Sequence, residues 1–268
     1  MGIQALLSDP IQYLRDVLLT LPAVLPALIL HECAHGWVAY KLGDPTAKML
    51  GRLSLDPRKH LDPLGTLSMI FIGLGWAKPV PINPRNFKHY RRDDFLVSIA
   101  GITANLIMFL IGCVLMLAMI LAAVKMIPAN MIRGASFYVE LSDGMYVLNM
   151  SDVAAYPHAM AEYLIAPYMG SVWGSVYEIV VNFVLINLSL AIFNLIPIPP
   201  LDGYHVLNDL ILKRPLFVSP QAARIGQLVM IGLLWSGYLG RGLNYVVTWA
   251  LGGVGGAYAA LFRLFGLM

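Results

Sequence analysis

The chain has 268 residues, of which 59% are hydrophobic and only 12% are charged. This composition lies far outside the range of soluble globular domains, and it predicts an integral membrane protein. The net charge of +3 does not indicate a nucleic-acid partner, because the basic residues are scattered between apolar blocks and mixed with acidic ones. We therefore expect the lipid bilayer as a partner and no nucleic acid. The two cysteines resemble neither a disulfide framework nor a cysteine metal site.

Several apolar blocks predict an all-α polytopic membrane protein with about six membrane segments, because a spanning helix needs roughly 20 mainly apolar residues. The first residues lack the basic region of a cleaved signal peptide and predict an interfacial lead-in. One block, residues 64–76, is too short for an ordinary span and predicts a short or re-entrant helix. The other predicted segments are 17–40, 95–124, 176–197, 222–239 and 243–265.

These blocks divide the chain into five predicted parts. One part, 126–174, is the only extended polar stretch and predicts an insert outside the membrane. Its acidic residues stand against a single arginine, Arg133; they are Glu140, Asp143, Asp152 and Glu162. In chain order the parts are an interfacial lead-in (1–16), the first half of a membrane core (17–125), the polar insert (126–174), the second half of the core (175–215) and the C-terminal membrane helices (216–268).

Three short loops are rich in Lys and Arg, and such loops stay on the cytoplasmic side of a membrane. They span residues 41–62, 78–94 and 201–224. The acidic insert then lies on the non-cytoplasmic side. The helices 17–40 and 176–197 both run inward, so the polar residues near their ends reach similar depths in the cytoplasmic half.

The first long apolar block contains the run His31-Glu32-Cys33-Ala34-His35. Two histidines at i and i+4 project from one face of a helix, about 6 Å apart along its axis, and can reach one zinc ion. Glu32 is placed to act as a general base toward a metal-activated water. Alternatively, these side chains are hydrogen-bonding links between helices. Three ionisable residues in one membrane segment are costly and favour the functional interpretation.

A hydrolytic zinc site needs a third protein ligand, and Asp202 is the candidate. It follows a proline-rich stretch from Asn194 to Gly203, where the backbone leaves helical geometry near membrane depth. The alternative for Asp202 is a helix N-cap. Asn194 is a candidate donor to a substrate carbonyl or developing oxyanion, and its alternative is an interhelical hydrogen bond.

Together these motifs resemble the site-2 protease family of intramembrane metalloproteases, most closely its short bacterial branch. The resemblance covers roughly residues 20–110 and 180–215, and it also rests on the segments 43–47, 51–55, 60–65 and 101–105. It implies a single zinc ion and catalytic residues as follows: His31, His35 and Asp202 as ligands, Glu32 as the base, and Asn105 and Asn194 as supporting polar residues. Ile102 stands where the family commonly has proline, so the sequence departs from the pattern next to Asn105.

The resemblance also implies a function and a location. Members of this family cut transmembrane proteins or peptides in or near their membrane segments, in regulated intramembrane proteolysis. We expect the same here, in the bacterial inner membrane, with the active site toward the cytoplasm. The chain is too short for the PDZ or CBS modules of some relatives, and its sequence does not indicate an oligomeric state.

Two segments beside the short helix predict a small membrane-edge β element. Residues 51–55 alternate in polarity, and residues 78–82 are kept extended by prolines. Such an edge would hold a substrate extended by β-augmentation. The alternative is a pair of plain interfacial loops.

The remaining histidines are expected to have ordinary roles. His60 and His89 lie in basic loops and are expected to be solvated, while His205 at best supports the metal site. Cys33 points away from the metal face of its helix and is expected to pack.

Two other functions remain open from the sequence. A metal-ion transporter also places His and Glu in membrane helices, but it commonly has several polar spans and a repeated architecture. A catalytically inert membrane scaffold is the second alternative, and the intact Glu32 argues against it.

Overall fold

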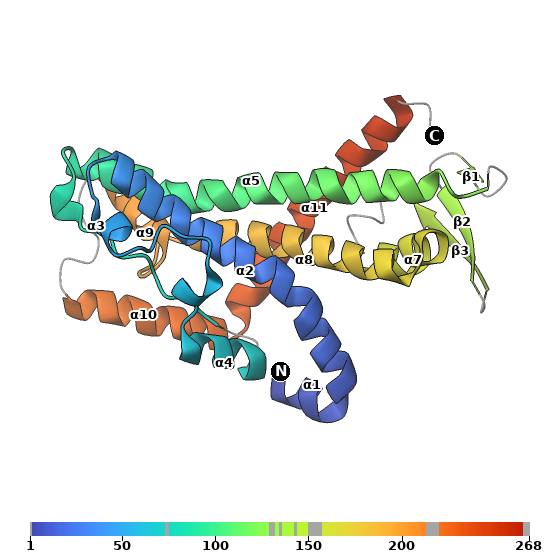
Figure 1. Ribbon diagram of the computed structural model, residues 1–268, viewed down its shortest axis with the longest axis horizontal. Helices are drawn as coiled ribbons and strands as arrows, with labels where there is room; N and C mark the ends of the chain where they lie inside the picture. The colour runs from blue at the N-terminus through green and yellow to red at the C-terminus, as the bar shows by residue number, and fades with distance from the viewer. Residues whose placement is uncertain are drawn as a thin grey trace. The chain divides into compact units, whose positions relative to one another are not determined.

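The computed structural model describes residues 2–72, 75–128, 132–133, 136–141, 144–149, 157–212 and 220–264. Helices predominate (Figure 1). Four of the described helices are long and apolar enough to cross a membrane: α2 (Pro10–Lys41), α5 (Tyr90–Val124), α8 (Ser171–Asn194) and α11 (Tyr238–Leu264). This confirms the predicted helical membrane protein. The two other predicted segments are the shorter helices α4 (Pro63–Ile72) and α10 (Pro220–Trp235), so a count of six crossings stays a prediction.

The chain forms two compact units. The first comprises Met1–Met108 and Ile186–Gly240, and the second comprises Phe109–Leu185 and Arg241–Met268. All six predicted site residues belong to the first unit.

The first unit opens with the short helix α1 (Gly2–Ser8), which is followed directly by α2. The Asp9 side chain caps α2 by accepting a hydrogen bond from the Gln12 backbone N–H at 3.0 Å, and Pro10 takes the first helical position. Pro22 and Pro26 lie inside α2 without ending it. The predicted lead-in is thus divided between α1 and the first turns of α2, which is longer than the predicted span.

The loops after α2 contain the short helices α3 (Thr46–Met49), η1 (Pro57–Lys59) and η2 (Pro84–Asn86). The buried Asp44 carboxylate ties two of these loops together. It accepts hydrogen bonds from the Thr46 hydroxyl at 2.5 Å, the Asn83 backbone N–H at 2.7 Å and the Asn86 amide at 2.7 Å. Burial raises the pKa of Asp44, but these donors outweigh burial and bring the pKa below its usual value.

The predicted membrane-edge strands do not form. Residues 51–55 and 78–82 are both described, and neither contains a strand. The two loops meet instead through an isolated bridge between Leu61 and Ala77. Pro79 and Pro81 have no backbone N–H, which explains why a ladder does not continue from this bridge.

The described strands lie in the second unit, within the predicted polar insert. They are β1 (Ile132–Arg133), β2 (Ser136–Leu141) and β3 (Gly144–Asn149), which pair antiparallel in the order β1-β2-β3. Tyr138 is the register partner of Val147. The acidic residues Asp143 and Asp152 lie outside the described residues.

The other described elements of the second unit are helices. They include η4 (Ala161–Ile165), α7 (Ala166–Met169), the later part of α5, the first part of α8 and most of α11. The Tyr258 hydroxyl donates a hydrogen bond to the Cys113 carbonyl within this unit. Its fully buried side chains include Met116, Ile120, Leu164, Tyr177 and Phe262.

The first unit ends with the proline-rich corner and the helices after it. α8 stops at Asn194, and helical geometry resumes in α9 (Asp202–Val206) and η5 (Leu207–Leu212). The predicted departure from helical geometry between Asn194 and Asp202 is confirmed. This corner brings the start of α9 to the part of α2 that carries the histidine pair (Figure 1).

Candidate active site

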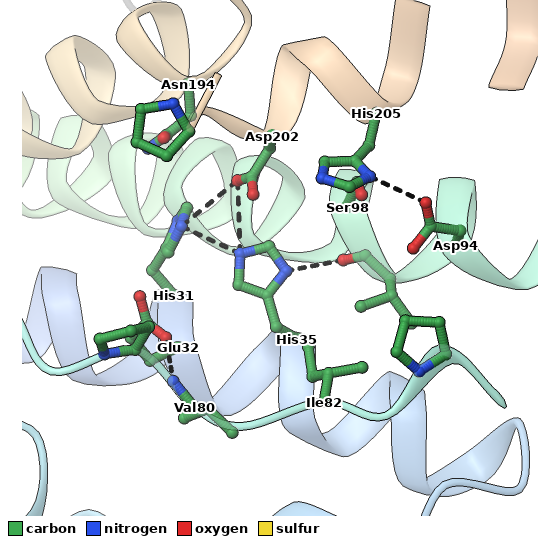
Figure 2. A pocket seen from close by; sticks show the side chains of 14 residues that line it. His31, Glu32, His35, Val80, Ile82, Asp94, Ser98, Asn194, Asp202 and His205 are labelled. Carbon is green, nitrogen blue, oxygen red and sulfur yellow. Dashed lines mark hydrogen bonds and ion pairs between the residues drawn. The ribbon is translucent and has the colours of Figure 1, made fainter. Parts of the chain in front are cut away.

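One turn of α2 places the His31 and His35 rings next to each other in a buried position. Their Nε2 atoms are 3.0 Å apart. The Asp202 Oδ2 atom, at the start of α9, lies 3.4 Å from His31 Nε2 and 3.3 Å from His35 Nε2 (Figure 2). Three potential ligand atoms from two distant segments therefore converge on one point.

The spacing of these atoms fits a zinc ion. Ligands about 2.0–2.2 Å from a tetrahedral ion lie about 3.3–3.6 Å from one another. Beyond the two imidazole nitrogens, Asp202 Oδ2 has no hydrogen-bond partner although it is buried. A buried carboxylate oxygen left in this way is costly unless a cation meets it. Two imidazoles and one carboxylate also form a common ligand set of catalytic zinc sites.

The Asp202 carboxyl is held in its ionised form. Burial raises its pKa, but the favourable interactions of the carboxylate with the His31 and His35 rings outweigh burial and bring the pKa well below its usual value. The charged carboxylate is the form that binds a metal.

Both imidazoles are oriented through their other nitrogen. His31 Nδ1 lies 2.6 Å from Asn105 Oδ1, and His35 Nδ1 lies 2.7 Å from the Val97 carbonyl oxygen. Because both partners are acceptors, each Nδ1 carries the proton. The Nε2 lone pairs then face Asp202, which is the orientation that a metal ligand needs.

Asn105 is fixed in turn by two further hydrogen bonds. Its amide nitrogen donates to Asn187 Oδ1 at 2.9 Å and to the Ala27 carbonyl at 3.3 Å. Both asparagines are fully buried. This chain of contacts runs from His31 through α5 to α8. The sequence interpretation missed Asn187, although its position two helical turns before Asn194 in an apolar span was an available signal.

Glycine at position 101 permits α5 to lie directly against the histidines. A Cβ atom at Gly101 would collide with His35 Nε2 and would lie 2.6 Å from His31 Cε1. Only glycine leaves room for both rings and for anything bound between them.

Glu32 lies beside the three potential ligand atoms, on the wall of a cavity of about 370 Å³. Its Oε2 accepts a hydrogen bond from the Val80 backbone N–H at 2.8 Å. The cavity extends from the histidines to the irregular segment after α4, as Figure 2 shows. The residues of that segment on the wall are Pro79, Val80, Ile82 and Pro84.

The two predicted supporting asparagines occupy different positions. Asn105 contacts His31 as described and does not line the cavity. Asn194 lines the cavity, and its amide nitrogen donates to the Leu190 carbonyl of its own helix at 3.0 Å. A contact between Asn194 and a substrate therefore stays a prediction.

Two expectations about histidines change. His60 is not solvated: only 1% of its surface is exposed, and its Nε2 lies 2.7 Å from the Ser54 carbonyl oxygen. Cys33 Sγ packs against the same carbonyl at 3.3 Å, in agreement with its expected packing role.

The second histidine, His205, is more closely tied to the cavity than expected, because it lines the wall and its Nδ1 lies 2.8 Å from Asp94 Oδ2.

Comparison with known proteins identifies the family. Peptidase family M50 matches residues 20–237. The chain belongs to this family, which is the site-2 protease family. Membership in M50 confirms the predicted resemblance, and together with the ligand set it confirms a zinc metalloprotease of the membrane.

Proteins of similar sequence that are named as zinc metalloproteases occur in several bacteria. YwhC of Bacillus subtilis, which is named as a zinc metalloprotease, is 36% identical over 204 residues, which are 76% of this chain and 74% of YwhC. Rip2 of Mycobacterium tuberculosis, named in the same way, is 26% identical over 231 residues, which are 83% of this chain and 70% of Rip2. Rip2 of Mycolicibacterium smegmatis is 24% identical over 245 residues, or 90% of this chain and 75% of the relative. No solved structure matches the chain at a significant level.

Proposed function

We propose that this protein hydrolyses peptide bonds in or near the transmembrane segments of membrane-protein substrates. In this proposal His31, His35 and Asp202 hold one zinc ion, and Glu32 is the general base. The observation that carries it is the convergence of the three potential ligand atoms beside Glu32. They line one cavity, and His31, Glu32 and His35 belong to α2, which is a candidate membrane span. We further propose that the cavity opens to the cytoplasm of a bacterial cell, because the three basic loops adjoin it in the chain.

The chemistry follows from the positions of these side chains. A zinc ion bound here lowers the pKa of a water molecule to about 7 and polarises the substrate carbonyl. Glu32 accepts the proton of the attacking water as its oxygen bonds to the carbonyl carbon. The same carboxyl then gives that proton to the amide nitrogen as the C–N bond breaks, which leaves a carboxylic acid and an amine.

A transmembrane helix hides its peptide bonds in its own hydrogen bonds, so a substrate must become locally extended before attack. The segment Pro79–Pro84 supports such a role. It lies along the cavity wall, and its prolines restrict it to non-helical geometry. We propose that an extended stretch of substrate lies beside this segment and replaces the Val80 N–H contact at Glu32.

The decisive experiment compares purified wild-type protein with Glu32→Gln on a panel of transmembrane peptides. We expect the variant to retain zinc and to lose at least about 100-fold in kcat, since a neutral amide cannot accept the proton. Glu162→Gln, at an exposed glutamate of the insert, is the matched control. Cleavage by Glu32→Gln at the wild-type rate would show that the mechanism is wrong, and an inactive wild type across the panel would favour a binding scaffold.

A second measurement tests the third ligand. Asp202→Ala removes the carboxylate and is expected to lower zinc occupancy, measured by elemental analysis of the purified protein. Unchanged occupancy would require another third ligand.

A further inference from the structure

A second titratable pair shares the cavity with Glu32 and the zinc ligands. Asp94, in the second turn of α5, is buried with only 7% of its surface exposed. Its Oδ2 lies 2.8 Å from Nδ1 of His205, whose side chain is 46% exposed. Both residues line the cavity (Figure 2). Neither has a role in the reaction described above.

The position of His205 follows from the short helix that carries it. His205 comes three residues after Asp202 in α9, so the two side chains leave neighbouring positions on one side of the helix. Figure 2 shows the His205 ring between the Asp94 and Asp202 carboxylates. The proline-rich corner that places Asp202 next to the histidine pair therefore also places His205 on the wall of the same cavity.

The pairing with Asp94 determines which ring nitrogen is available. Asp94 accepts the Nδ1 proton, as a carboxylate does when it orients a catalytic imidazole. Nε2 is then the nitrogen on the opposite edge of the ring. A half-exposed imidazole on a cavity wall, held by a buried carboxylate, is placed to meet a group that enters the cavity.

The surroundings favour a proton on Nε2 as well. The hydrogen bond that His205 donates to Asp94 raises the pKa of His205, with further contributions from the charges of Asp209 and Asp202, while burial opposes the rise. Burial and the nearby Asp94 charge raise the pKa of Asp209 to about 6. Besides His205, the titratable residues of the cavity and of the adjoining pocket are His31, Glu32, His35, Tyr90, Arg91, Asp94, Asp202, Tyr204 and Asp209.

We propose that His205, oriented by Asp94, is a catalytic hydrogen-bond donor of the peptidase: its Nε2–H donates to the substrate carbonyl oxygen as the tetrahedral intermediate forms. This inference rests on the proposed function. The water oxygen bonds to the carbonyl carbon, Glu32 takes the water proton, and the π electron pair moves to the carbonyl oxygen. His205 stabilises the negative charge on that oxygen and keeps its own proton, so the products remain those of simple hydrolysis. Donors aimed at a developing oxyanion are among the largest contributions to catalysis.

The test uses the full-length, zinc-loaded protein and the variants His205→Gln, His205→Asn and Asp94→Asn. We expect His205→Gln to lower kcat by about 100-fold with a much smaller change in KM and with zinc content unchanged. His205→Asn is the second variant if the first fails to fold. His89→Gln, at an exposed histidine of the preceding loop, is the matched control and is expected to cleave like the wild type.

The pH dependence separates a donor from a merely structural residue. The protonated ring is the active form, so wild-type kcat is expected to fall as pH rises through the pKa of His205. Asp94→Asn removes the charge that raises this pKa, so the fall is expected at lower pH. In His205→Gln this fall is expected to be absent. NMR titration of the labelled His205 ring gives the same pKa independently of cleavage, with a lower value in Asp94→Asn.

The outcomes are distinguishable. If Glu32→Gln cleaves as fast as the wild type, the proposed function fails. If Glu32→Gln is inactive but His205→Gln cleaves normally with the same pH profile, only the role of His205 fails.

A cation site is the alternative for this pair. The potential ligand atoms of Asp94, His205 and Asp209 lie within 4.8 Å of one another, a spacing that a metal ion could bridge. Two metal ions per chain in the wild type and one in His205→Gln would overturn the proposal and assign the pair to a cation site.

Discussion

The helical wall of the cavity differs from the wall formed by residues 79–84 in the way its residues are held. On the helical wall, His31 and His35 are oriented by hydrogen bonds to Asn105 and to the Val97 carbonyl, in a buried contact between α2 and α5. On the other wall, irregular chain is held by side chains from neighbouring loops. The cavity thus has one wall of packed helices that carries the potential metal ligands and one wall of irregular chain that is held by loop contacts.

The loop wall depends on a small number of contacts. Arg52 Nη2 donates to the Lys78 carbonyl at 2.9 Å and to the Pro79 carbonyl at 3.2 Å. The Asn83 backbone N–H is held by Asp44 at the other end of the segment. Changes in the helical wall should therefore affect metal binding, and changes in the loop wall should affect substrate choice.

Gly101→Ala should have the largest effect. The added methyl group collides with both imidazoles, and neither α2 nor α5 can yield without disturbing the ligand atoms. We expect loss of zinc and cleavage below detection, measured by elemental analysis and peptide assay. Gly232→Ala is the control, because no atom lies within 4 Å of where a Cβ would stand at this position. A zinc-loaded, active Gly101→Ala would mean that the α2–α5 contact is less fixed than its geometry indicates.

Asn105→Ala should weaken zinc binding without abolishing it. The variant removes the acceptor that orients His31 and leaves Nδ1 unpaired in a buried site. Loss of such a partner typically costs 10- to 100-fold in metal affinity. The measurement is a zinc competition titration with a chelator. An affinity equal to that of the wild type would break the proposed link between the asparagine and the metal site.

Ile82→Ala should leave zinc unchanged and alter substrate preference. This side chain lines the cavity from the loop wall, where it is half-buried. Removing apolar contacts of this size changes discrimination between substrates by roughly tenfold or more. The measurement is kcat/KM on peptides that differ by one side chain next to the cleavage site. A uniform loss on all peptides would instead indicate damage to the catalytic residues.

Asp44→Asn should have the smallest effect on cleavage and act mainly on stability. The carboxylate accepts several hydrogen bonds in a buried loop contact, and its replacement is expected to cost about 1–3 kcal/mol. The folded-state pKa of Asp44 is lowered, so its contribution is present above the unfolded pKa and is lost as pH falls through the folded pKa. Thermal unfolding in detergent should show a lower Tm for the variant at pH 7 and a smaller difference at acidic pH. An equal difference at both values would contradict this assignment.

The sequence predicted the parts of the site that depend on local geometry. A helix alone is enough to place His31 and His35 on one face. The break in helical geometry before Asp202 follows from the restricted backbone of the prolines alone. The apolar blocks located the ends of α2, α5, α8 and α11 to within about three residues, because hydrocarbon thickness limits the apolar length of a spanning helix. Their starts were predicted about five to seven residues too late, since each helix begins before its apolar block. The approach of Asp202 to the histidines was inferred from matching depths, and the described geometry brings these atoms together.

The parts that were missed depend on how distant helices pack. The contact between His31 and Asn105 was implied only by family resemblance, and Asn187 has no pattern of its own. Similarly, the pairing of Asp94 with His205 joins residues far apart in the chain, and no repeating pattern of residues along one helix or strand predicts it.

The incorrect expectations have a shared physical cause. Alternating polarity and proline favoured strands at 51–55 and 78–82, but proline removes the donors that a sheet needs. The polar character of its loop favoured a solvated His60, whereas the ring is buried against the Ser54 carbonyl. In both cases the composition of a segment was a weaker guide than its hydrogen-bonding partners.

The placement of the ligands has a thermodynamic consequence. His31 and His35 come from α2, in the first of the two chain segments that form the first unit, while Asp202 comes from α9 in the second segment. An ion bound by all three is a cross-link between segments that are remote in the chain, and its binding free energy adds to the stability of the assembled helices. Depletion of zinc would therefore lower the resistance of this unit to unfolding, in proportion to the logarithm of the free zinc concentration, before any effect on substrate is considered.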